Sequence, residues 1–177
     1  VSQLVVEGAD RSAKIESLGW TPLHLAARKG HLACVKHLCG PNTGDLERSG
    51  YPGLLEEKDH DGLTPLLMAA ESWHKVETLR YLADMGAKVD AKARDGTTGL
   101  SLAIARGDLE TVKFFVERGG SELLFRKFEG RRKRNALMFA AEQGYAFIVE
   151  YLLESSSEEQ IARTDAFGNT PLMLAAE

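Results

Sequence analysis

A short motif of small and apolar residues recurs along the chain. TPLHLAA at 21–27 returns as TPLLMAA at 64–70 and as TPLMLAA at 170–176, with weaker copies TGLSLAI at 98–104 and NALMFAA at 135–141. The first positions of these copies are 43, 34, 37 and 35 residues apart. Self-similarity at a spacing of roughly 20 to 50 residues is typical of repeat architectures. The chain is therefore predicted to be a stack of similar units, each of which buries its apolar face only against its neighbours.

Each copy has the features of a helix start. A Thr hydroxyl, or the amide of Asn135, can accept a hydrogen bond from a free helical N–H, and Pro suits the first helical position. Gly30, Gly107 and Gly144 follow at a distance that suits a left-handed helix end. Apolar residues at helical spacing in 109–116 and 148–153 predict a second helix. The unit is therefore helix, tight turn, helix and extended connector.

These residues resemble the ankyrin-repeat family, which has a period of about 33 residues and a T-P-L-H-x-A signature. GHL at 30–32 and MGAKVD at 85–90 also stand where that family has G-H-L and x-G-A-x-V-N. The resemblance implies an all-α solenoid of stacked helix-turn-helix units with short hairpin-like finger loops. It also implies that His24 joins neighbouring fingers by hydrogen bonds, in a network that is weaker in the later repeats because other residues replace this histidine there.

The register divides a single domain, residues 1–177, into repeats. Both ends resemble incomplete repeats, so we expect further repeats or other domains to flank this sequence. The predicted divisions are the end of a preceding repeat at 1–17, a repeat at 18–58 with a long finger insertion at 40–58, repeats at 59–92, 93–129 and 130–164, a basic insertion at 121–134, and the start of a further repeat at 165–177.

The insertion at 40–58 is rich in Gly and Pro, which favours a loop over an additional long helix. A tolerated surface loop is the favoured interpretation, because loops accept extra length at small entropic cost. The alternative is that Tyr51, Leu54 and Leu55 place apolar contact area on the binding side of the repeats.

The insertion at 121–134 contains six basic residues. A solvated finger loop is favoured, followed by contact with an acidic protein partner, and nucleic acid or phosphoinositide ranks last. The six residues are Arg126, Lys127, Arg131, Arg132, Lys133 and Arg134.

The third repeat departs most from the motif. Gly99 replaces the proline and Ile104 replaces the second alanine. We expect a looser helix start and a larger side chain at a tight helix contact, and hence the easiest local opening in this repeat.

Composition limits the function classes. The formal net charge is −4, which gives no overall attraction to nucleic acid or anionic lipid. No apolar run reaches the roughly 18 residues needed to span a bilayer. Two cysteines, Cys34 and Cys39, are too few for a disulfide framework and favour a reducing compartment, so we expect a cytoplasmic protein with the nucleus as an alternative.

No common phosphate-binding, dinucleotide-binding or zinc signature is present, so no cofactor, small-molecule substrate or enzymatic activity is expected. His31, Cys34, His37 and Cys39 lie close enough in sequence to suggest a metal site. The repeat register instead predicts that Cys34 is an apolar core position. A methyl-lysine cage, which some ankyrin-repeat domains form, remains a further alternative, but the sequence does not bring three aromatic residues together.

The resemblance implies a protein or peptide partner bound on the concave, finger-bearing surface. The alternative is a targeting or regulatory region of a larger enzyme, channel or effector. Trp20 is the strongest single candidate, and Arg28 and Lys29 beside it suggest an acidic segment in the partner. A Trp that merely covers the fingers is the alternative. The expected contact residues are Leu18, Trp20, Arg28 and Lys29; His60, Asp61, Leu63, Glu71 and Ser72; Arg94, Asp95, Thr97 and Arg106; and Arg131, Arg132, Arg134, Glu142 and Gln143.

Overall fold

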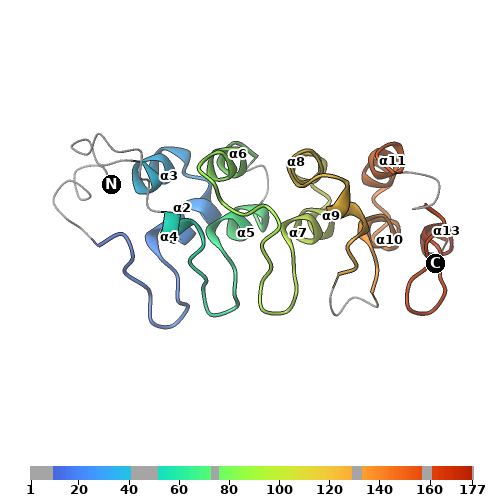
Figure 1. Ribbon diagram of the computed structural model, residues 1–177, viewed down its shortest axis with the longest axis horizontal. Helices are drawn as coiled ribbons and strands as arrows, with labels where there is room; N and C mark the ends of the chain where they lie inside the picture. Colours follow the sequence, from blue (N-terminus) through green and yellow to red (C-terminus); the bar gives the residue numbers. More distant parts are fainter. Residues whose placement is uncertain (1–9, 41–51, 73–75, 129–132, 157–160, 177) are drawn as a thin grey trace.

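The computed structural model describes residues 10–40, 52–72, 76–128, 133–156 and 161–176. Helices lie in two rows with loops projecting beneath them (Figure 1). The inner row, next to the loops, contains α2 (Pro22–Lys29), α5 (Pro65–Ala70), α7 (Gly99–Arg106), α10 (Ala136–Glu142) and α13 (Pro171–Ala175). The outer row contains α3 (Leu32–Cys39), α6 (Val76–Asp84), α8 (Leu109–Gly119) and α11 (Ala146–Glu154). The predicted all-α solenoid is confirmed.

The loops that precede the inner helices are called fingers 1 to 5. Their backbones close on hydrogen bonds that define them as residues 15–20, 59–63, 93–97, 128–134 and 165–169, of which 129–132 lie outside the described residues. Isolated antiparallel bridges join Ile15 to Trp20 and Lys92 to Thr98. No helix among the described residues is long and apolar enough to cross a membrane.

The inner helices begin where the motif predicts. The hydroxyls of Thr21, Thr64, Thr98 and Thr170 each accept a hydrogen bond from the backbone N–H three residues later, and the amide oxygen of Asn135 does the same. Gly30 and Gly107 end α2 and α7 in the left-handed region. These caps satisfy backbone groups that a helix leaves free at its ends.

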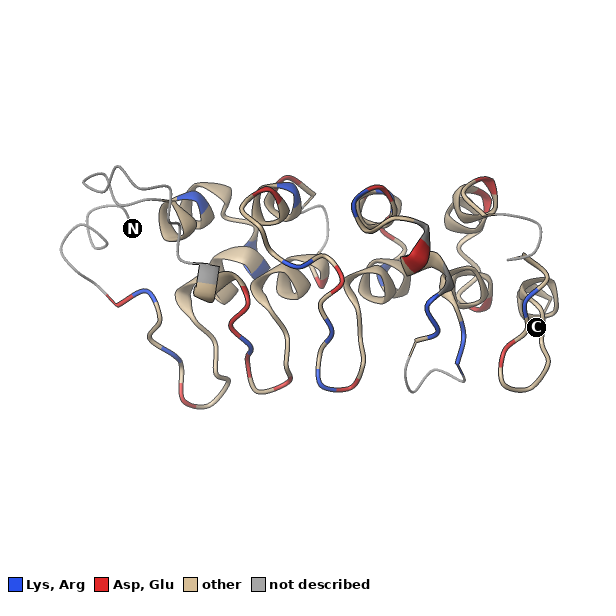
Figure 2. Cartoon of the chain, viewed as in Figure 1, with Lys and Arg blue, Asp and Glu red and all other residues tan. Residues whose placement is uncertain are grey.

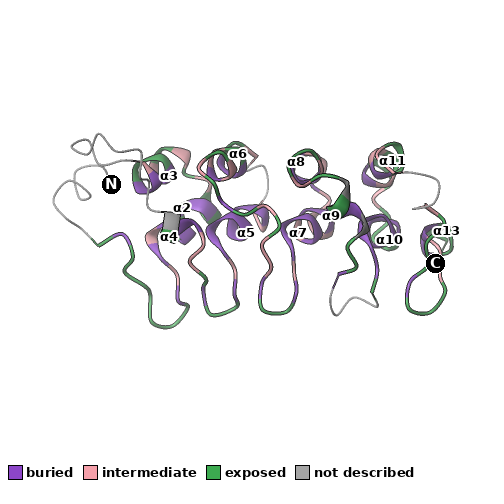
Figure 3. Cartoon of the chain, in the orientation of Figure 1, coloured by how far each residue is buried: buried purple, intermediate pink, exposed green. Residues whose placement is uncertain are grey.

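The core lies between the two rows of helices (Figure 3). Ala26, Ala69, Ala103 and Ala140 hold equivalent positions, five residues after the cap, and their exposures are 6%, 0%, 0% and 0%. Each inner helix packs against the next, α2 on α5, α5 on α7, α7 on α10 and α10 on α13. Small side chains at these contacts let the helix backbones approach closely, as the paired alanines predict.

Neighbouring fingers also touch through their backbones. His60 N donates to Leu18 O over 3.1 Å, and Arg94 N donates to Asp61 O over 2.9 Å. Gly62, with a φ of +82°, permits the second contact, because a Cβ there would lie 2.6 Å from Arg94 N. The fingers are therefore joined to one another rather than projecting separately.

His24 forms the link that the family resemblance implies. Its Nδ1 accepts from Thr21 N at 3.2 Å, which leaves Nε2–H to donate to Leu63 O at 3.0 Å. The ring is 0% exposed and joins α2 to finger 2. Leu67 and Met138, which replace it in later repeats, have no side-chain group that could donate such a bond.

The described parts of the two insertions each contain a short helix. Residues Pro52–Leu55 form the short helix α4, and Leu54 and Leu55 join the core at 6% and 4% exposure. The hypothesis that these leucines provide exposed contact area is therefore wrong, because the core covers them. Tyr51 lies outside the described residues.

The basic insertion is likewise anchored rather than wholly solvated. Residues Ser121–Phe125 form the short helix α9, and Leu123, Leu124 and Phe128 are buried. Phe128 packs edge-on against Phe139 of α10, with ring centroids 5.9 Å apart. Among its described cations, Arg126, Lys127 and Lys133 are exposed and fit the prediction of a solvated finger, whereas Arg134 is buried.

Gly99 has a packing role that the motif does not show. The Phe115 ring of α8 lies so close that a Cβ on Gly99 would approach its Cζ to 2.1 Å. Thr98 and Ser101 form a reciprocal capping box around this helix start. The glycine therefore leaves room for Phe115, and the expected loose helix start is reinforced by the cap, while easier local opening in this repeat stays a prediction.

The last inner helix exposes apolar surface. Leu172 and Met173 of α13 are 80% and 56% exposed. A hollow of about 490 Å³ lies between α10, α11 and α13, with Val149 and Leu153 on its wall. In the first repeat the equivalent residues Leu23 and His24 are buried, and α2 packs on both α3 and the next inner helix, α5. That further repeats flank this sequence stays a prediction.

Gly99→Ala tests the packing role. Alanine is the better helix former by about 1 kcal/mol, yet we expect the variant to be destabilised by about 1 to 3 kcal/mol because its methyl group overlaps Phe115. Urea unfolding followed by circular dichroism measures the change. Gly53→Ala is the control, since a Cβ there meets nothing within 4 Å. Equal stability of Gly99→Ala and the wild type would contradict this role.

The His24 link predicts acid sensitivity. Burial lowers the pKa of His24 below its usual value of 6.5, and protonation at Nδ1 would remove the acceptor for Thr21 N. Because the unfolded chain then binds the proton more readily, stability should be constant above about pH 6.5 and should fall as the pH drops toward the lowered pKa. Urea midpoints at several pH values between neutral and mildly acidic measure this.

His24→Gln should reduce the fall in stability, whereas His60→Gln, which changes an exposed histidine, should keep it. The same pH dependence in the wild type and His24→Gln would show that other groups cause the loss.

Candidate functional site

One position shows how the fingers are tied together. It directly precedes each helix cap and holds Trp20, Leu63, Thr97, Arg134 and Asn169. Trp20 reaches forward to the next finger, where its Nε1–H donates to Asp59 Oδ2 over 3.0 Å. Arg134 makes the equivalent contact, from its Nε to Asp165 Oδ2 over 3.4 Å.

The two receiving aspartates also fold their own fingers. Asp59 Oδ1 accepts from the backbone N–H groups of Asp61 and Leu63, at 2.9 and 2.8 Å. Asp165 Oδ1 accepts in the same way from Phe167 and Asn169. Burial opposes ionisation of Asp165, but these backbone bonds and Arg134 outweigh it and lower the pKa of the carboxyl. Each aspartate therefore shapes its own turn and holds the preceding finger.

Arg134 is not available to a partner, contrary to the sequence prediction. Its side chain is 2% exposed and is enclosed by Asp165 and Glu142. Its Nη1 forms an ion pair with Glu142, and its Nε pairs with Asp165. Among the described residues its Nη2 has no hydrogen-bond partner. Trp20 and Arg134 differ in chemistry, yet each side chain contacts the following finger, so variation at this position is not a sign of free exposure.

Trp20 is half-buried by its link to Asp59, and the guanidinium of Arg28 lies 4.8 Å from the centroid of its ring. Stacking of this kind covers one face of the indole and orients the arginine. Trp20 thus covers part of the fingers, as the alternative interpretation expected, and is half-buried rather than fully exposed for a partner. Arg28 and Lys29 are exposed.

Fingers 2 and 3 bring a group of the predicted contact residues together around a groove of about 530 Å³. Leu63, Ala93 and Leu102 are its apolar side chains. The remaining residues that line it are Asp61, Glu71, Arg94, Asp95 and Thr97. Charges of both signs lie along these fingers (Figure 2). The groove thus combines apolar area with charged groups, as protein-binding surfaces commonly do. It is called the 2/3 groove below.

Small side chains explain why the 2/3 groove is open. The position that holds Asp59 in finger 2 and Asp165 in finger 5 holds Ala93 in finger 3. The position that holds Trp20 and Arg134 holds Leu63 in finger 2, and Leu63 cannot donate a hydrogen bond. The space that Trp20 fills between fingers 1 and 2, and Arg134 between fingers 4 and 5, is therefore left free.

The other predicted contact residues are more dispersed. Leu18, His60 and Gln143 are exposed, Ser72 is half-buried, and Arg131 and Arg132 lie outside the described residues. The Arg106 guanidinium lies 3.9 Å from the Glu71 carboxylate, and Glu142 pairs with Arg134.

Sequence reasoning missed Asp59, Ala93 and Leu102. The first two share one position relative to the helix caps, so comparing that position between repeats could have indicated them.

The cysteines occupy core positions. Cys39 is buried, which raises the pKa of its thiol to about 12, and Cys34 packs partly buried against the same core. The prediction that Cys34 takes an apolar core position is confirmed. Within the described part of the chain, no group of three His, Cys, Asp or Glu side chains is arranged to hold a metal ion.

Comparison with known proteins agrees with the stacked architecture. A family model described as ankyrin repeats (3 copies) matches residues 1–93, 49–125 and 100–177, which together cover the whole chain. The chain belongs to the ankyrin-repeat family. The fold and the resemblance inferred from the motif are thereby confirmed.

Several relatives are ankyrin-repeat or regulatory proteins by name. The chain is 33% identical over 140 residues to the NF-kappa-B inhibitor zeta of Bos taurus, which covers 66% of this chain and 19% of that protein. It is 29% identical over 136 residues to the ankyrin repeat domain-containing protein 63 of Homo sapiens, which covers 74% and 34%. It is 31% identical over 112 residues to the Rabankyrin-5 of Mus musculus, which covers 62% and 10%. The chain thus spans only a minor part of each relative's length.

A double-mutant cycle tests the link between fingers 1 and 2. Trp20→Phe removes the indole N–H donor. Asp59→Asn replaces one carboxylate oxygen, an acceptor, with an NH2 group, a donor. We expect each to destabilise the chain and the pair to show a coupling of about 0.5 to 1.5 kcal/mol, the contribution of one hydrogen bond. Urea unfolding measures it. The pair Trp20→Phe and Asp61→Asn is the control and should be additive; an equal coupling there would count against a specific bond.

Proposed function

We propose that the chain is a protein-protein interaction module that binds a protein or peptide partner on its concave, finger-bearing surface and has no catalytic activity of its own. The observation that carries this proposal is the 2/3 groove, which gathers exposed charged groups around apolar side chains. The groove lies on fingers that are held by the helix stack, and binding residues often lie on loops positioned by a rigid scaffold.

The partner surface extends beyond the groove. Arg28 and Lys29 at the end of α2 are exposed, as are His60 and Asp61 in finger 2. These cations could meet an acidic segment of the partner, while the 2/3 groove itself contains more carboxylates than cations. The proposed surface is therefore of mixed charge, which favours a protein over a nucleic acid or a phosphoinositide membrane.

A second candidate is that these repeats target or regulate a catalytic, channel or effector domain of a larger protein. The observation that favours it is that the relatives are much longer than this chain, which spans 19% of one and 10% of another. One relative is by name an inhibitor of NF-kappa-B. Both candidates use the same binding surface.

We further propose a cytoplasmic location, with the nucleus as the alternative. The two cysteines are free in the structure, which fits a reducing compartment.

Quantitative affinity capture tests the binding proposal. Wild-type chain on beads is compared with the variant Arg28→Glu/Arg94→Glu, which reverses two exposed cations on the finger side. We expect the variant to lose about tenfold or more of at least one retained protein, because interface arginines often contribute strongly to binding. Mass spectrometry of the retained proteins measures the loss.

Arg80→Glu on the outer helix α6 is the matched control, because it reverses one exposed cation away from the fingers. Circular dichroism verifies that all variants are folded. If Arg80→Glu loses the same proteins, or if all three baits retain equal amounts, the partner does not bind the finger surface.

A further inference from the structure

We infer that the 2/3 groove is a subsite for an arginine side chain of the partner, flanked in the partner by an apolar residue. This inference rests on the proposed binding function and specifies its chemistry. It follows from a comparison of equivalent positions within the chain, because two other pairs of fingers show which groups fill this space.

Arg134 shows how an arginine is held at the equivalent place in another repeat of this chain. It projects from the position before the cap of α10 and is held by Glu142, seven residues after that cap, and by Asp165 in the next finger. In the second repeat, Leu63 takes the position of Arg134 and Glu71 takes the position of Glu142. Glu71 is thus placed as Glu142 is, but its own repeat provides no cation at the position of Leu63.

The charge of Glu71 indicates that the groove binds an arginine rather than an aromatic ring of the partner. In the first repeat the space is filled by Trp20, and the residue seven positions after the cap is a cation, Arg28, which stacks on the ring. In the fourth repeat the filling group is a cation and that residue is a carboxylate. Because the second repeat has a carboxylate, Glu71, the complementary group is a guanidinium.

The groove provides the other contacts that an arginine needs. Leu63 and Leu102 can cover its alkyl stem, since long cationic side chains bury their methylenes and leave the charged end at polar groups. Asp61 and Asp95 add two carboxylates near Glu71, against the single lining cation Arg94. The Arg106 ion pair with Glu71, at 3.9 Å and 41% side-chain exposure for the arginine, is too long and too solvated to occupy Glu71 fully.

A phage-displayed library of random linear peptides, selected on the wild-type chain, tests this subsite. We expect enrichment of an arginine next to an apolar residue. A synthetic peptide of the selected sequence should bind Glu71→Gln about tenfold more weakly, through loss of a charge-assisted hydrogen bond. Leu63→Arg, which places a guanidinium where Arg134 has its own, should fill the groove and abolish peptide binding while the chain stays folded.

Ala33→Arg is the matched control, because Ala33 is exposed and belongs to α3, a helix of the outer row away from the fingers. It should leave peptide binding unchanged. Replacing the peptide's arginine with citrulline, which is neutral and nearly the same size, should weaken binding as much as Glu71→Gln does.

The outcomes separate this inference from the proposed function. Selected peptides that lack arginine, or that bind Leu63→Arg as tightly as the wild type, would overturn the arginine subsite and leave finger-surface binding supported by the capture experiment. A library that yields no binding peptide would also count against the subsite. If capture on the finger surface fails as well, the proposed function fails independently.

Discussion

Close packing of each inner helix on the next determines the geometry of the whole molecule. The equivalent residues Ala26, Ala69, Ala103 and Ala140 of these helices are small and buried. A larger residue at all of these positions would push the helices apart, since packed interiors have little spare volume. The short distance between helices also brings the first three fingers close enough to hydrogen-bond with one another, as His60 does with Leu18 and Arg94 does with Asp61. Packing in the core therefore sets the spacing of the surface.

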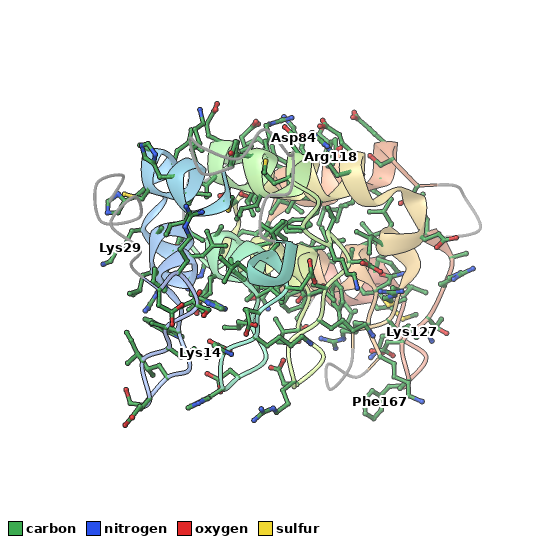
Figure 4. The ribbon with its side chains drawn as sticks, turned by 60° about the vertical axis from the view of Figure 1, so that its left-hand side comes forward. Lys14, Lys29, Asp84, Arg118, Lys127 and Phe167 are labelled. Atoms are coloured by element: carbon green, nitrogen blue, oxygen red, sulfur yellow. The ribbon has the colours of Figure 1, made fainter. Side chains whose placement is uncertain are left out.

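Because the distance between fingers is fixed, the side chains that face each other across neighbouring fingers must fit together. The side chain before one helix cap must suit the side chain that begins the next finger, and the solutions differ from pair to pair. A hydrogen bond crosses the gap between Trp20 and Asp59, and another crosses it between Arg134 and Asp165. Leu63 and Ala93 are apolar and make no such bond, so the gap remains as the 2/3 groove. On the outer row an exposed ion pair adds to the apolar packing: Arg118 of α8 donates to Asp84 of α6 at 2.6 Å, and the two side chains lie near each other (Figure 4).

The sequence predicted those features that depend on neighbours in the chain. The Thr and Asn caps, the glycine helix ends and the alternation of inner and outer helices follow from residues a few positions apart. Features that depend on contacts between repeats could not be found in that way. Arg134 looked exposed because the aspartate that buries it lies 31 residues later, and Gly99 looked like a weak helix start because the Phe115 ring belongs to another helix. Within the candidate site, the exposed finger residues were predictable, but the groove that unites them was not.

An open gap between two fingers also links binding to the stability of the stack. Each repeat is stabilised largely by its contacts with its neighbours. Fingers 1 and 2 gain the Trp20 to Asp59 bond and fingers 4 and 5 gain the Arg134 ion pairs, whereas Leu63 and Ala93 give fingers 2 and 3 no such bond from these positions. A partner side chain held between Glu71 and the third finger would supply a contact of that kind from outside. Because a ligand that binds only the folded state stabilises it, occupation of the groove would strengthen the junction between the second and third repeats, where the chain's own side chains leave space.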